Sequence, residues 1–231
     1  MTTLRVDDRV WDIIPDLTLL VIGYHDFNNS GTVPPTVLSS AASEAAMFLT
    51  QPVFSENPVV AEWREIYRRF RTKKGVRSSI ESLLKRVSNG QSLPRINPLV
   101  DIYNAMSVKY GIPCGAEDLH AVEGDIVLSF AVGGESFRAL GDDIDSPALE
   151  GELCYIDQVG VLCRCLNWRE SSRTSISDTT RDAVIVVEAL GSSEDRARAA
   201  IRELCGLLQE HAGGRLTYGE ASRVSPVVGL D

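Results

Sequence analysis

The feature that most constrains the fold is a seven-residue run, AVIVVEA at residues 183–189. Its β-branched side chains favour a strand, and a continuous apolar run is typical of a strand that is covered on both faces. We therefore predict a central, buried strand. One carboxylate, Glu188, interrupts the run, and burying it is costly unless it is paired or contacts a ligand. The alternatives are that Glu188 faces solvent at the strand end or pairs with a neighbouring arginine.

The rest of the chain shows helical and strand patterns around this run. Apolar spacing and capping residues predict helices over residues 36–49, from Asn57-Pro58, from Ser78, over 98–110 and from Ser193 to 213. Alternating or continuous apolar runs predict strands at 17–23, 126–131, 153–157 and 160–166. Because no repeat or linker divides the chain, we expect an α/β fold of the mixed α+β kind, a single compact domain with mixed β-sheet flanked by helices.

Length and composition exclude several classes of protein. The 231 residues are 44% hydrophobic and 24% charged, which is typical of a globular chain. No apolar stretch approaches the roughly 20 residues that cross a membrane, and the mixed, acidic N-terminal residues do not resemble a signal peptide. Five cysteines, an odd number, do not indicate a disulfide framework. We therefore expect a cytoplasmic protein with reduced thiols and no membrane contact.

Positive charge is concentrated in one segment. The whole chain has a formal net charge of −9 at pH 7, yet residues 62–95 hold ten basic side chains and only three acidic ones. An acidic chain is a poor general binder of nucleic acid, but a basic segment within it attracts a polyanion to one place. The alternative is an ordinary solvated helix face. The candidate RNA-binding residues are Arg68, Arg69, Arg71, Lys73, Lys74 and Arg77.

Standard catalytic and cofactor motifs are absent from the sequence. It holds no P-loop, no GxGxxG after a strand, no GxSxG and no HExxH. The three histidines lack metal-ligand spacing, and Cys163 and Cys165, which lie in a strand pattern, favour packing over metal binding. We therefore predict no cofactor and no metal, and the residues identify no catalytic group.

A segment rich in arginine and hydroxyl groups, residues 164–181, lies between two predicted strands. Guanidinium and hydroxyl groups are suited to phosphate or sugar contacts, and Trp168 is suited to stacking on a base. The alternative is a solvated loop in which Trp168 packs into the core. The candidate substrate-binding residues of this segment are Asn167, Arg169 and Arg173, with Arg164 as further pocket lining.

Residues 95–137 carry a helix motif, a Gly-x-Pro motif and a strand followed by a glycine turn. The matching positions are Val100, Asp101 and Asn104, then Gly111, Pro113, Ala116 and Asp118, then Glu123, Gly124, Ile126, Ala131, Gly134 and Glu135. With this spacing, the segment resembles the B3/B4 domain, the tRNA-editing region of the phenylalanyl-tRNA synthetase beta chain. Weaker similarity in the strands LCYID and VIVVEA extends the resemblance to about residues 65–215.

The resemblance implies a fold like that editing domain, with residues 61–231 forming the B3/B4-like domain and residues 1–60 adding a strand and a helix integrated into the fold. It also implies a pocket that hydrolyses tyrosine wrongly attached to the phenylalanine tRNA, so that tRNA or aminoacyl-tRNA is the expected partner. By this resemblance Asn104 lines the pocket and Glu188 reads a polar group of the amino-acid side chain. Because these 231 residues leave no room for an aminoacylation module, we do not expect a complete tRNA ligase.

Two positions depart from the family pattern. Gly115 stands where the family has histidine, and Glu117 stands where it has phenylalanine, so both join the candidate substrate-binding residues. Two functions stay open: a free-standing deacylase acting on mischarged aminoacyl-tRNA, and a non-catalytic module that binds RNA, an amino acid or a small metabolite. A third alternative is a subunit that docks on a synthetase. Positioning a water and stabilising the oxyanion suffice for an activated ester, which fits a sequence without an evident nucleophile.

Overall fold

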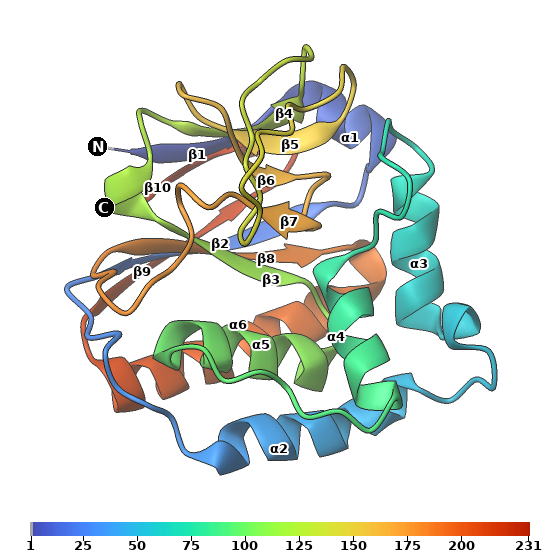
Figure 1. Ribbon diagram of the computed structural model, residues 1–231, viewed down its shortest axis with the longest axis vertical. Coiled ribbons are helices and arrows are strands. Elements are labelled where there is room, and N and C mark those ends of the chain that lie inside the picture. Colours follow the sequence, from blue (N-terminus) through green and yellow to red (C-terminus); the bar gives the residue numbers. More distant parts are fainter. Residues whose placement is uncertain (1) are drawn as a thin grey trace.

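Two β-sheets lie face to face in the computed structural model, which describes residues 2–231, and helices cover the outer face of one sheet (Figure 1). The six-stranded sheet has the order β10-β1-β4-β5-β6-β7, and the four-stranded sheet has the order β3-β8-β2-β9. In the larger sheet β1 and β4 run parallel, whereas the other pairs in both sheets are antiparallel. The mixed α+β class and the single compact domain are therefore confirmed.

The elements have the following bounds. The strands are β1 (Thr3–Val6), β2 (Thr18–His25), β3 (Cys114–Asp118), β4 (Ile126–Phe130), β5 (Leu153–Ile156), β6 (Val161–Arg164), β7 (Arg169–Glu170), β8 (Ala183–Ala189), β9 (Arg215–Ala221) and β10 (Val227–Gly229). The helices are α1 (Asp8–Ile13), α2 (Pro35–Glu44), α3 (Pro58–Tyr67), α4 (Ser79–Ser88), α5 (Pro98–Tyr110) and α6 (Glu194–Ala212).

The β-branched run at 183–189 is β8, and it pairs with β3 on one side and β2 on the other. This central position confirms the prediction of a buried inner strand. Because side chains alternate along a strand, Ile185 and Val187 face the helix layer, while Val184, Val186 and Glu188 face the other sheet. The strand therefore carries its single carboxylate into the space between the two sheets.

The helices form a layer on the outer side of the four-stranded sheet. Helices α5 and α6 pack against each other and against β3, β8 and β2, and α2 lies beyond α5 (Figure 1). Helices α3 and α4 flank the two sheets at one end, where they connect the helix layer to the larger sheet (Figure 1). The basic segment of the sequence covers these two helices and the turns that follow them.

Of the two helix caps expected at Ser78 and Asn57, one is present in the structure. The Ser78 hydroxyl accepts a hydrogen bond of 3.2 Å from the backbone N–H of Glu81, so it caps α4 as predicted. The Asn57 side chain makes no cap to α3, because its oxygen accepts from the N–H of Gln51 and its amide donates to Phe54. The cap predicted at Asn57 is therefore wrong, although the helix begins there.

Candidate functional site

A cavity of about 200 Å³ lies between the two sheets. Its walls are mostly apolar, with Leu4 and Ile126 from the larger sheet and Val184 and Val186 from β8. Three carboxylates lie among these apolar groups, and they belong to Glu117, Glu170 and Glu188. A small apolar cavity with a few converging polar groups is the usual form of a site for a small ligand or a ligand end.

Strands β3 and β8 form one wall of the cavity. Gly115 is opposite Val186 and Glu117 is opposite Val184 in the register of these strands. Residues two apart on a strand share a face, so Glu117 and Glu188 both extend toward the cavity. Gly115 leaves room between them: a Cβ placed there would lie 3.8 Å from the nearest atom, Oε1 of Glu170.

The opposite wall is one cross-strand row on the larger sheet. Tyr155 of β5 is paired with Cys163 of β6, and Cys163 is paired with Glu170 of β7. All three side chains line the cavity. The Tyr155 hydroxyl crosses the space between the sheets and donates a hydrogen bond of 2.8 Å to Oε1 of Glu188. The two sheets are therefore joined inside the cavity by a polar contact between buried side chains.

Asn167 is held in one orientation. Its oxygen accepts from the Tyr67 hydroxyl at 3.0 Å and from the backbone N–H of Ser79 at 3.1 Å. Its amide nitrogen is consequently directed at Glu188 and donates to Oε2 of that carboxylate. The two preceding residues, Cys165 and Leu166, have φ of 47° and 62°, a left-handed conformation that costs about 1–2 kcal/mol per residue for side chains other than glycine. The chain accepts this strain at the turn that presents Asn167.

Glu188 is the best-satisfied carboxylate of the cavity. It is 2% exposed, and each of its oxygens accepts a hydrogen bond, one from Tyr155 and one from Asn167. Burial raises the pKa of Glu188 to about 7, although both hydrogen bonds act in the opposite direction. Of the interpretations of Glu188, solvent exposure and pairing with an arginine are both wrong, because its partners are a tyrosine and an asparagine.

Glu117 and Glu170 have fewer partners. The Thr174 hydroxyl donates to Oε2 of Glu117, and the Tyr103 hydroxyl lies 3.5 Å from Oε1 of Glu170. Burial and the neighbouring Glu170 raise the pKa of Glu117 well above its usual range, and burial raises the pKa of Glu170 to about 7. Each carboxyl therefore holds a proton more readily than an exposed glutamate does.

The structure brings together five of the seven candidate substrate-binding residues. Gly115, Glu117, Asn167, Arg169 and Glu188 all line the cavity. Arg169 lies at its edge, where its guanidinium pairs with Asp142 at 2.9 Å. Trp168 also lines the cavity and packs partly buried against the core, as its alternative interpretation had it.

Asn104, which the resemblance placed in the pocket, and Arg173, a candidate substrate-binding residue, do not line this cavity. Asn104 follows Tyr103 on α5, and one residue turns the helix by about 100°, so Tyr103 reaches Glu170 while Asn104 is directed away. Arg173 instead pairs with Asp157 at 2.8 Å and donates to the carbonyl of Ala121 at 2.6 Å.

Arg164 likewise contributes to packing rather than to the pocket. It is 1% exposed, and its guanidinium pairs with the buried Glu152, with Nη2 2.6 Å from Oε1. The expected pocket role of Arg164 is wrong because its strand, β6, directs Cys163 toward the cavity and the next residue to the other face.

Sequence reasoning missed several cavity residues, namely Tyr155, Cys163, Glu170 and Ser79. Tyr155 and Cys163 lie in strands that were predicted, so alternation within those strands was the available signal. Glu170 lies in a two-residue strand without its own sequence signature. The Ser79 hydroxyl is buried and has no hydrogen-bond partner within residues 2–231, a property that depends on distant contacts and has no sequence signal.

An open groove of about 620 Å³ lies beside the cavity, between the end of α3 and the start of α4. Among the candidate RNA-binding residues, Arg68, Lys73, Lys74 and Arg77 line this groove, whereas Arg69 and Arg71 are exposed outside it. Acidic neighbours reduce the positive charge, since Glu81 pairs with Arg64 at 2.6 Å and Glu65 pairs with Arg68 at 2.7 Å. Lys74 and Arg77 have no such partner within residues 2–231 and remain exposed cations.

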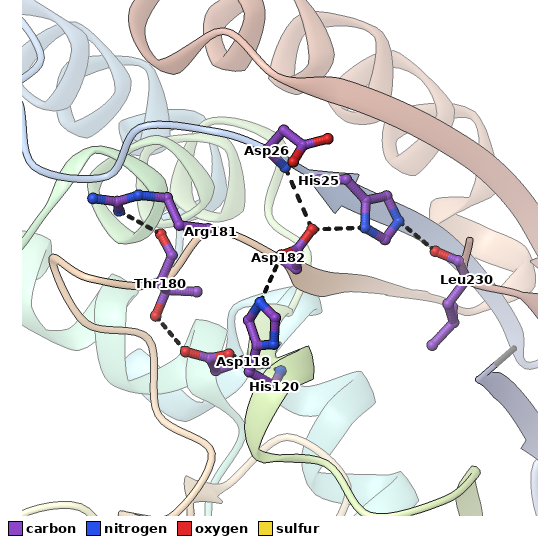
Figure 2. Close-up of polar contacts among 8 residues, drawn as sticks. All are labelled: His25, Asp26, Asp118, His120, Thr180, Arg181, Asp182 and Leu230. Carbon is purple, nitrogen blue, oxygen red and sulfur yellow. Dashed lines mark hydrogen bonds and ion pairs between the residues drawn. The ribbon is translucent and has the colours of Figure 1, made fainter.

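Two of the three histidines meet at one carboxylate, and none of these three residues lines the cavity. Figure 2 shows His25 and His120 on either side of Asp182, with ring nitrogens 2.9 and 2.8 Å from its two oxygens. The other ring nitrogen of His25 lies 2.6 Å from the carbonyl of Leu230, so this cluster ties the segment after β10 to β2. Burial opposes ionisation of Asp182, but the hydrogen bonds from both histidines outweigh it and lower its pKa.

The structure offers no grouping of metal ligands and no membrane-spanning helix within residues 2–231. Across residues 2–231, no group of three or more His, Cys, Asp or Glu side chains is arranged to hold a metal ion. None of the helices in this range is both long and apolar enough to cross a membrane. The histidine cluster of Figure 2 consists of hydrogen bonds between the two imidazole rings and Asp182.

The two-sheet fold is similar to a known one. The crystal structure of an N-terminal fragment of the phenylalanyl-tRNA synthetase beta-subunit from Pyrococcus horikoshii aligns with a TM-score of 0.50 and 13% sequence identity. The alignment covers 95% of this chain and 54% of the fragment, so the chain spans about half the length of that relative. At this identity the likeness is one of fold.

The family follows from the sequence match. Residues 62–213, more than half of the chain, match the B3/4 domain, and the chain belongs to the B3/4 domain family. This match confirms the resemblance that the motifs of residues 95–137 indicated. Among curated proteins, none matches the chain.

Proposed function

We propose that this protein binds the aminoacyl end of a tRNA and hydrolyses the ester that joins the amino acid to the RNA. The aminoacyl group would occupy the cavity between the sheets, and phosphates of the RNA would lie along the basic groove. Membership of the B3/4 domain family and the fold shared with a tRNA synthetase fragment support an RNA partner.

The observation that carries the proposal is the position of Asn167 between groove and cavity. Tyr67, which lines the groove, donates a hydrogen bond to the oxygen of Asn167, and the amide of Asn167 donates to Glu188 in the cavity. The two concave surfaces are therefore neighbours that share one hydrogen-bonded side chain. A ligand with a charged backbone and a small end group would use both surfaces at once.

The chemistry we propose needs no covalent intermediate. A water oxygen attacks the ester carbonyl carbon, the bond to the ribose oxygen breaks, and the water proton passes to that oxygen, which leaves a free amino acid and a free RNA hydroxyl. The cavity thiols are poor nucleophiles, because burial raises the pKa of Cys114 and of Cys163 and keeps both protonated. Binding and orientation supply much of the acceleration for such an ester.

Ser79 is the residue we assign to the oxyanion. Its hydroxyl is buried without a partner, lines the cavity, and lies at the first residue of α4. A hydroxyl donor at a helix N-terminus stabilises negative charge that develops on a carbonyl oxygen. Hydrolysis thus gains a positioned donor that is not already used within the protein.

A second candidate function is a non-catalytic module that binds an amino-acid-like ligand. The observation that favours it is the partial neutralisation of the groove, where Glu65 and Glu81 pair with two of the arginines. A groove with less free charge binds RNA phosphates more weakly.

We also propose that residues 61–231 are the functional B3/4-like unit and that residues 1–60 are integrated into its fold. The pairing of β1 and β2 within the two sheets supports this division.

Single-turnover hydrolysis of a panel of aminoacyl-tRNAs tests the proposal. We expect at least one member to lose its amino acid faster with protein than in buffer. Ser79→Ala should slow that reaction by about 100-fold or more while leaving tRNA affinity unchanged. The matched control is Ser82→Ala, an exposed serine on the same helix. If no aminoacyl-tRNA is hydrolysed above the buffer rate, the deacylase function is wrong and the binding module replaces it.

A further inference from the structure

Two carboxylates of the cavity lack the partners that buried acids usually have. Glu117 of β3 is 8% exposed and Glu170 of β7 lines the opposite wall. The Thr174 hydroxyl donates to one oxygen of Glu117. Among residues 2–231, the one hydrogen bond to the Glu170 carboxylate is a long contact of 3.5 Å from the Tyr103 hydroxyl. Within residues 2–231, no lysine, arginine or histidine forms an ion pair with either of them.

The two carboxylates are close to each other across the cavity. The nearest atom to a Cβ built on Gly115 is Oε1 of Glu170, at 3.8 Å, so Glu170 lies over β3. Glu117 lies two residues further along the same face of β3. A negative charge on one carboxylate makes ionisation of the other less favourable. Ionising both therefore costs free energy.

Glu188 provides a comparison within the same cavity. Both of its oxygens accept hydrogen bonds from the protein, so it needs nothing further. A structural role explains Glu188 but does not explain the other pair. Buried acids without a cation are costly unless they hold protons or receive a cationic ligand.

We propose that the cavity binds a positively charged nitrogen of its ligand, a primary ammonium group, between Glu117 and Glu170. The inference rests on the proposed function in one respect, namely that this nitrogen belongs to the amino acid delivered into the cavity. The apolar walls at Ile126, Val184 and Val186 then contact the aliphatic part of the ligand. Two sources have this chemistry: the α-ammonium group that aminoacyl esters carry and the side-chain ammonium of a lysine-like residue.

Binding would be linked to proton release. Burial raises the pKa of both acids, to about 7 for Glu170, so the empty cavity holds protons that an ammonium group must displace. Affinity should therefore fall as the pH drops below about 7, and for an α-ammonium ligand it should also fall above about pH 8, where the ligand loses its own proton. The other titratable or charged groups that face the pair are Tyr103 of α5, Cys114 of β3, Tyr155 of β5, Cys163 of β6, Glu188 of β8, and Asp157 and Arg173 beside Glu117.

Isothermal titration calorimetry with four small amides tests this inference without any RNA. Leucine amide carries the α-ammonium alone, Nα-acetyl-lysine amide carries the side-chain ammonium alone, lysine amide carries both, and Nα-acetyl-leucine amide carries neither. We expect at least one ammonium-bearing probe to bind about tenfold or more tightly than Nα-acetyl-leucine amide. The stronger of the two single-ammonium probes identifies the source of the nitrogen.

Variants localise the effect. Glu117→Gln and Glu170→Gln keep the side-chain shape, and each should weaken binding of the ammonium-bearing probe about tenfold and reduce its pH dependence, because one of the two titrating acids is lost. The control Glu150→Gln replaces an exposed acid outside the cavity and should change nothing. Circular dichroism and urea unfolding establish that each variant is folded. The inference would be overturned if the protein bound the ammonium-bearing probes no more tightly than Nα-acetyl-leucine amide. It would also be overturned if both glutamine variants bound the ammonium-bearing probes with wild-type affinity. Binding of the amides without any binding of tRNA would leave it standing and remove the proposed function.

Discussion

The Tyr155 hydroxyl, from the six-stranded sheet, donates a hydrogen bond of 2.8 Å to the carboxylate of Glu188 on the four-stranded sheet. Both side chains are buried, at 6% and 2% exposure, and both line the cavity between the sheets. Asn167 occupies the second oxygen of Glu188. This contact fixes how far the two sheets stand apart beside the cavity, and it leaves Glu117 and Glu170 as the acids with unused hydrogen-bonding capacity.

Removing the hydroxyl of Tyr155 should destabilise the protein. Tyr155→Phe leaves one oxygen of a buried carboxyl group without a donor, and the expected loss in the free energy of unfolding is about 1.5–3 kcal/mol. Urea unfolding measures the loss. Tyr218→Phe is the matched control, since Tyr218 is 52% exposed and water replaces its hydrogen bond. Equal losses in the two variants would contradict a buried bond between the sheets.

The pH dependence of stability should report Glu188. Its pKa rises from an ordinary 4.5 to about 7 on folding, so the folded state binds the proton more tightly than the unfolded state does. The stability that this proton contributes is complete below about pH 4.5 and is lost as the pH rises through 7. Relative to Glu188→Gln, the wild-type free energy of unfolding should fall by up to about 3 kcal/mol across this interval.

Urea unfolding of both proteins at about pH 5 and about pH 8 gives that comparison. The glutamine variant loses hydrogen-bonding complementarity at every pH, which lowers its stability by a constant amount. The informative quantity is therefore the change in unfolding free energy between the two pH values, compared between wild type and variant. Parallel pH profiles for the two proteins would show that Glu188 keeps an ordinary pKa.

The sequence predicted the main elements of the fold because their signals are local. The run at 183–189 gave the central strand β8, and the apolar spacing of residues 98–110 gave α5. Strands β3 and β7 were not predicted, since CGAED lacks the alternation of a strand and β7 has two residues. Their places depend on pairing with β8 and β6, which are distant contacts.

The candidate site was predicted in part for the same reason. Glu188 stood out as a carboxylate within an apolar run and Asn167 as part of the arginine- and hydroxyl-rich segment, and the two side chains do contact each other. Arg164 and Arg173 have the same composition signal, but distant acids at Glu152 and Asp157 pair with them. A single sequence does not reveal which arginine has a buried partner, so the cationic lining expected for the pocket is reduced to Arg169.

Arg164 should prove structural. Arg164→Met leaves the fully buried Glu152 without its cation, and the expected loss in unfolding free energy is about 3–5 kcal/mol. The double variant Arg164→Met with Glu152→Leu removes both charges and should recover most of that loss. Chemical denaturation of the three proteins measures it. A single variant as stable as wild type would contradict the buried ion pair.

The exposed cations of the groove should set the salt dependence of tRNA binding. Replacing Lys74 and Arg77 with glutamate removes two positive charges that have no acidic partner within residues 2–231. The slope of log affinity against log salt should become shallower by about 1.5, because each phosphate contact contributes about 0.7–0.9. Filter binding over a range of salt concentrations measures the slope. The control is Arg202→Glu, an exposed arginine on α6. An equal change in both variants would mean that the groove is not the RNA surface.

The most direct test of the account compares the affinity of charged and uncharged tRNA. Gly115→Leu should fill the cavity without altering the groove, since a Cβ at this position meets nothing closer than 3.8 Å. We predict that wild type binds at least one aminoacyl-tRNA about tenfold more tightly than the same tRNA uncharged, and that Gly115→Leu binds both forms with the wild-type affinity for uncharged tRNA. Equal affinity of the wild-type protein for charged and uncharged forms of every tRNA in the panel would contradict the claim that the cavity receives the aminoacyl group.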